Sequence, residues 1–191
     1  MNPALRSAHE LLLQQLALYL REAEEILTAW DDYTEHLVDN EGWPLDETSY
    51  GFRQARRDAD TWRSYGRIRL SAEDLVAAAE AQLRALPKAG VNPRWAWQIA
   101  SLHTAAEEIS ALQSDWLDFR ATLPGSARPG VEEYDGPLAE RNAEAWHYLN
   151  EWSVHGHAVL DIHSAAQRSR PQSTAPAPAL PSPRSTAGPH R

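Results

Sequence analysis

The chain has 191 residues, a formal net charge of −9 and no cysteine. This length suits a single domain with a sizeable core, and the lack of cysteine excludes disulfides, thiolate metal sites and cysteine nucleophiles. The sequence contains no uncharged apolar run of about 20 residues that could cross a membrane. Gln14 and Gln15 interrupt the apolar N-terminal stretch, and no cleavage site follows it. These features predict a cytoplasmic protein.

The first predicted helix spans residues 4–38 and carries two rows of apolar side chains at heptad spacing. One row is Leu5, Leu12, Tyr19, Ile26 and Tyr33, and the other is Leu16, Ala23, Trp30 and Leu37. Rows of this kind form a seam that must be buried against partner helices. Asp39-Asn40-Glu41-Gly42, followed by Trp43-Pro44, ends the helix.

Asp46 is a candidate N-cap for a second helix that reaches about Tyr65. Its predicted core face consists of Phe52, Ala55, Ala59, Trp62 and Gly66. Ser71 and Asp74 form a weak capping box at the start of a third helix, residues 72–86. The pattern leaves open whether residues 47–86 form one rod broken near residues 66–71 or two separate helices.

Asn92 and Pro93 predict the start of a further helix, which ends near residue 123. After a Gly/Pro loop, Asp135 and Pro137 open a last helix that ends near residue 166. Four rods joined by short breaks predict an all-α fold, specifically a four-helix up-down bundle of residues 1–167. Residues 168–191 are rich in Pro, Ser, Ala and Arg, a composition that predicts a disordered tail.

Metal-ligating side chains recur on the predicted last helix. Glu144 and His147 have the Glu-x-x-His spacing of carboxylate-bridged di-metal bundles, and an imidazole and a carboxylate one turn apart can bind a cation. A second Glu-x-x-His is missing from the sequence, so the alternative is a solvated helix face with i, i+4 polar pairs. The candidate metal ligands are Glu144, His147, Glu151, His155 and His157.

The late histidines His155, His157 and His163 also give the chain a partial resemblance to the DinB-like bundles, a helical family of metal-dependent transferases. That resemblance implies a metal ion bound by three histidines. The His-x-x-x-His pair of the family is absent, although His157 and Asp161 have the same spacing.

An arginine stripe lies on one face of the second predicted helix and the residues that follow it. Guanidinium groups beside aromatic rings can bind nucleic acid or an acidic protein partner. The alternative is internal, because an antiparallel hairpin would lay the acidic second half of the 4–38 helix beside the arginines. The stripe consists of Arg53, Arg56, Arg57, Arg63 and Arg67.

The sequence contains no phosphate-binding glycine loop, nucleophile elbow or zincin motif, and it predicts no cofactor. The favoured function is therefore a non-enzymatic accessory protein that acts through protein–protein contacts. Apolar residues that flank the first seam, among them Leu11, Leu18 and Leu27, predict self-association as a homodimer. A metal-binding helical-bundle enzyme and a nucleic-acid-binding protein are the alternatives.

Overall fold

The structure is a computed structural model that describes residues 3–39 and 41–169. This part of the chain is helical, apart from turns and one isolated bridge between Val38 and Pro44, so the all-α prediction is confirmed. None of its helices is long and apolar enough to span a membrane. The predicted disordered tail lies outside the described residues from position 170 onward. The elements are α1 (Pro3–Leu37), α2 (Glu47–Tyr65), α3 (Ala72–Ala85), the 3-10 turn η1 (Lys88–Gly90), α4 (Trp95–Thr122), α5 (Glu132–His155) and α6 (His157–Arg168).

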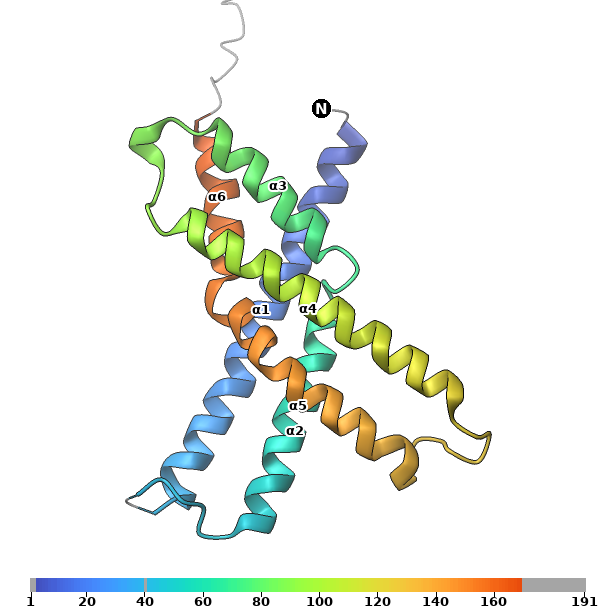
Figure 1. Cartoon of the computed structure of the whole chain (residues 1–191). Coiled ribbons are helices and arrows are strands. Elements are labelled where there is room, and N and C mark those ends of the chain that lie inside the picture. The colour runs from blue at the N-terminus through green and yellow to red at the C-terminus, as the bar shows by residue number, and fades with distance from the viewer. Residues whose placement is uncertain (1–2, 40, 170–191) are drawn as a thin grey trace, which may run out of the picture.

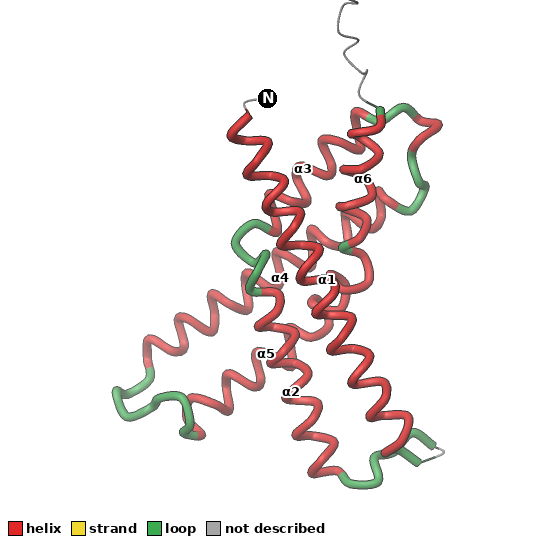
Figure 2. The backbone as a smooth tube through the Cα atoms, turned by 180° about the vertical axis from the view of Figure 1, so that it is seen from behind, coloured by secondary structure: helices red, strands yellow, loops and turns green. Residues whose placement is uncertain are grey.

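The helices do not form the predicted four-helix up-down bundle. Figures 1 and 2 show that α1 and α2 run together in one arm, whereas α4 and α5 run together in a second arm that diverges from the first. Beyond the crossing, α3 packs against α4 and α6, and the first half of α1 extends toward the same end of the molecule. The prediction was wrong because two of the four expected rods are broken, so neither runs the full length of a bundle.

The first break separates α2 from α3. Gly66–Ser71 forms a series of turns, in which the backbone N–H groups of Arg67, Ile68 and Ser71 each donate to a carbonyl three residues earlier. The segment 47–86 is therefore two helices, one packed on α5 and the other on α4 and α6. The predicted capping box is absent, because the Ser71 hydroxyl donates back to the Ile68 carbonyl and makes no cap hydrogen bond.

The second break divides the predicted last helix into α5 and α6 at Gly156. A Cβ atom built on Gly156 would lie 2.7 Å from the Leu20 Cδ2 atom of α1. Glycine therefore lets α1 approach the backbone closely at this joint. At its other end, α5 begins at Glu132, earlier than predicted, and contains Pro137 inside the helix, where the missing N–H removes one backbone hydrogen bond.

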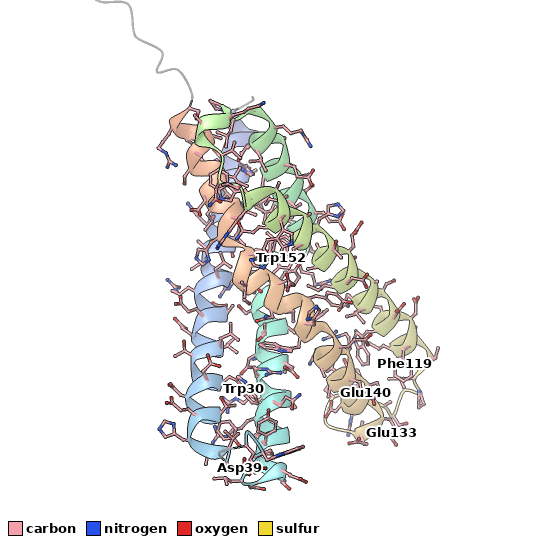
Figure 3. The ribbon with its side chains drawn as sticks, turned by 60° about the vertical axis from the view of Figure 1, so that its left-hand side comes forward. Trp30, Asp39, Phe119, Glu133, Glu140 and Trp152 are labelled. Atoms are coloured by element: carbon pink, nitrogen blue, oxygen red, sulfur yellow. The ribbon has the colours of Figure 1, made fainter. Side chains whose placement is uncertain are left out.

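An aromatic cluster fills the place where α1, α2 and α5 cross, within a core that also extends through α3, α4 and α6. Tyr19, Tyr65 and Trp152 are fully buried there, and their rings meet edge-on in series with centroids 5.5 and 5.7 Å apart. The Tyr19 hydroxyl donates to the Leu149 carbonyl of α5. Burial raises the pKa of both tyrosines, so they remain neutral. We call this cluster the crossing region; Figure 3 shows Trp152 within it.

The turn between α1 and α2 follows from its polar residues. The Asp46 carboxylate accepts hydrogen bonds from the Thr48 amide and the Ser49 hydroxyl, which confirms it as the N-cap of α2. Asp39 similarly accepts from the amides of Glu41 and Trp43. Gly42 has a φ of +86°, a conformation that favours glycine. The resulting antiparallel hairpin places the second half of α1 beside α2, as the sequence predicted.

Candidate functional site

An open groove of about 1350 Å³ lies between the second half of α1 and α2. Both helices contribute aromatic and charged side chains to it. The α1 wall consists of Glu22, Glu25, Ile26, Ala29, Trp30 and Tyr33. The α2 wall consists of Thr48, Ser49, Phe52, Arg53, Arg56, Arg57, Asp60, Arg63 and Ser64, and Arg67 follows in the next turn. The groove therefore contains the whole predicted arginine stripe.

Aromatic rings hold two of the arginines against α1. The Arg53 guanidinium lies 4.4 Å from the centre of the Tyr33 ring. The Arg57 guanidinium lies 4.4 Å from the Trp30 ring and 3.7 Å from the Trp146 ring of α5. Cation–π contacts of this kind are each worth about 0.5–2 kcal/mol, depending on desolvation. They fix the α1–α2 register and explain why Trp30, labelled in Figure 3, points across the arm toward α2.

The predicted acid–arginine pairing between the two helices is present at one position. Arg67 donates to both carboxylate oxygens of Glu22, and the Ser64 hydroxyl donates to the same carboxylate. These hydrogen bonds hold the pKa of Glu22 below its usual range. Among the described residues this ion pair joins α1 to the turn that follows α2, whereas Arg56 and Arg63 both pair with Asp60 on α2 itself.

The Arg57 guanidinium is held by the buried carboxylate of the next residue, Asp58. Its Nε and Nη2 atoms donate to Asp58 Oδ1 at 2.9 and 2.7 Å, and the Asp58 side chain is almost completely buried. Burial raises the pKa of Asp58, and the adjacent Arg57 opposes that rise. Arg57 therefore serves the packing of α2 against α1 and α5. In contrast, Arg56 and Arg63 keep 74% and 76% of their side-chain area exposed, so they are accessible to a ligand.

The structure corrects the predicted core face of α2. Phe52 is 71% exposed at the groove, and Ala55 is also exposed. The face of α2 that is buried against α5 carries Asp58, Thr61 and Tyr65. The apolar spacing of Phe52 and Ala55 was misleading because the core-facing positions of this helix are partly polar and satisfied by local bonds, such as Thr61 Oγ1 to the Arg57 carbonyl.

The candidate metal ligands do not come together in one cluster. Glu144, His147 and His157 are exposed. Glu151 and His155 face α4 instead, where the Ser101 hydroxyl donates to Glu151 Oε2 at 2.5 Å and His155 Nε2 lies 3.6 Å from the same oxygen. Within the residues that the structure describes, no group of three or more histidine or acidic side chains is arranged to hold a metal ion.

Sequence reasoning missed a buried arginine on α5. Arg141 is stacked on Trp62 at 3.8 Å and donates to the side-chain oxygens of Gln113 and Asn142. Burial lowers its pKa to about 10. Its spacing from the apolar residues Leu138 and Ala145 could have placed it on the core face. It packs α5 against α2 and α4, away from the groove.

The chain matches no protein-family model, no curated protein and no solved structure.

Proposed function

We propose that the protein is a non-enzymatic interaction protein that binds a helical segment of a protein in the α1–α2 groove. The observation that carries this proposal is the combination of an open groove of about 1350 Å³ with exposed Phe52 and half-buried Trp30 and Ile26 on its walls. An apolar stripe on a helix can be buried in a groove of this kind, and aromatic anchors commonly dominate such contacts. We expect the protein to act in the cytoplasm.

The charges of the groove indicate the chemistry of the bound segment. Its lining contains five arginines and three acids, Glu22, Glu25 and Asp60, although the chain as a whole carries −9. A segment with acidic side chains beside its apolar stripe would complement Arg56 and Arg63. Each exposed ion pair contributes only about 0–1 kcal/mol, so these arginines would select the partner and its orientation more than they raise affinity.

The test is affinity capture from nuclease-treated host lysate with Phe52→Asp and Phe119→Asp variants. Phe119, labelled in Figure 3, is 42% exposed on the other arm and is the matched control. We expect Phe52→Asp to abolish a stoichiometric complex that wild type and Phe119→Asp both form. Identical capture by all three proteins would exclude the groove as the binding surface.

Nucleic-acid binding is the second candidate, supported by the exposed guanidinium groups of Arg56 and Arg63 beside Phe52. It predicts retention on single-stranded nucleic acid that falls steeply with salt and is lost in Arg56→Glu. The three acids in the groove make this the weaker candidate.

The metal-dependent alternative stays a prediction. It requires a stoichiometric amount of metal bound to the wild-type protein and less metal bound to His155→Gln. Elemental analysis of both proteins would measure these amounts.

A further inference from the structure

The apolar seam of α1 is less completely buried beyond the crossing region than within it, although Tyr33 near its end is buried. At the crossing region Tyr19 and Ala23 are buried by neighbouring helices. Farther along, Ile26 and Trp30 are only half-buried, and Ala29 is exposed. Within the described residues, α2 is the helix that packs along this part of α1. A second pair of helices packed on α1 and α2 would complete a four-helix layer and bury these side chains.

We infer that the second half of this layer is the α1–α2 hairpin of a second copy of the chain, with the two grooves facing each other. This inference rests on the proposed function, that the groove binds protein, and names its partner. A face-to-face contact is isologous, so each groove covers the other and the assembly closes as a dimer.

Charge along the groove indicates an antiparallel arrangement. Near the crossing region the groove lining holds three acids, Glu22, Glu25 and Asp60, which outnumber Arg63 and Arg67 there, and Glu22 contacts Arg67. Arg53 and Arg56 lie toward the other end, where Arg53 contacts Tyr33. A two-fold axis across the groove therefore places the arginine end of each copy over the glutamate end of the other. A parallel arrangement would place Arg53 and Arg56 of one copy opposite the same two residues of the other, which is unfavourable.

Two of these side chains are accessible for pairing between copies. Glu25 is 70% exposed, with only a 4.0 Å approach to Arg21. Arg56 is 74% exposed, and its contact with Asp60 is shared with Arg63. The net charge of −9 makes two copies repel at most other surfaces. The α1–α2 groove brings opposite charges and apolar side chains together, which favours association there.

A charge swap tests the arrangement directly. We expect wild type to sediment as two chains at micromolar concentration. Glu25→Arg and Arg56→Glu should each weaken self-association about tenfold or more, because each places like charges opposite one another twice. An equimolar mixture of the two variants should recover the two-chain mass, because both contacts become attractive again in the mixed dimer. Circular dichroism of each variant would confirm that these exposed substitutions leave the helices intact.

Glu133→Arg is the matched control, because Glu133 is exposed near the end of the α4–α5 arm. This variant should sediment as two chains.

A one-chain mass for wild type at every concentration would overturn the inference. The inference would also be overturned if Glu25→Arg and Arg56→Glu are each monomeric alone and their equimolar mixture stays monomeric. If wild type is monomeric yet Phe52→Asp still abolishes capture from lysate, the proposed function stands with a foreign partner. If Phe52→Asp changes neither the sedimentation mass nor the capture from lysate, the groove is not a binding surface.

Discussion

Arginines from one sequence stripe have different roles in the structure. Arg57 is enclosed by Asp58, Trp30 and Trp146, and Arg67 is paired with Glu22. Arg56 remains largely exposed. The stripe was predictable from helical spacing, but the separation into packing and accessible residues was not. That separation depends on which side chains of α1 and α5 lie opposite each position.

His9 predicts a dependence of stability on pH. Its ring lies 5.2 Å from that of His163, its Nε2 atom is buried without a hydrogen-bond partner, and burial lowers its pKa although Glu10 opposes this. The unfolded chain therefore binds a proton first as the pH falls through the ordinary histidine pKa of about 6.5. The free energy of unfolding should decrease as the pH falls through this window and then level off below the folded-state pKa.

Denaturant unfolding of His9→Leu and His147→Gln between neutral pH and pH 5 would check this expectation. His9→Leu should reduce the slope of stability against pH. His147 is exposed, so His147→Gln should retain the wild-type slope. An unchanged slope in His9→Leu would assign the pH dependence to another group.

At the level of elements, the sequence predicted helices better than it predicted where they break. The start of α2 was correct because its signal is local: Asp46 reaches the amide two residues away. The α5–α6 break at Gly156 was missed, and one contact that requires glycine there, the close approach of Leu20 from α1, is remote in the sequence. An isolated glycine in an apolar helical pattern does not by itself distinguish a break from a tolerated substitution.

The joint can be tested with a matched pair of glycines. Gly156→Ala should lower the free energy of unfolding by about 1–3 kcal/mol, because the new methyl group overlaps Leu20 and the Trp152 carbonyl. Gly51 lies on the exposed surface of α2 with no atom near its Cβ position, so Gly51→Ala should raise stability by about 0.5–1 kcal/mol. Chemical denaturation would measure both changes. A stable Gly156→Ala variant would show that the joint relaxes without cost.

At the level of the whole molecule, the α1–α2 arm buries less than the crossing region. Between residues 24 and 60 the buried side chains of the α1–α2 arm are those of Tyr33 and Asp58, whereas Leu16, Tyr19, Tyr65 and Trp152 are completely or almost completely buried at the crossing. Local opening requires less free energy where fewer apolar contacts must be broken.

Hydrogen exchange with mass spectrometry should therefore show faster amide exchange in residues 27–37 and 47–56 than in residues 13–23. Protection of the arm should rise with protein concentration if the grooves of two copies close on each other. Equal protection of the arm and the crossing region in a dilute sample would contradict this account of how stability is distributed.

The sequence alone determined the all-α class, the α1–α2 hairpin and the membership of the arginine stripe, because each depends on residues close together in the chain: heptad rows, the Asp46 cap and helical spacing. The tertiary structure decided that the helices cross and diverge, that Phe52 is exposed, and that Glu151 and His155 pack against α4. It also decided that the stripe faces an open groove. These features depend on which faces of distant helices meet, and apolar periodicity specifies that a face must be buried without specifying its partner.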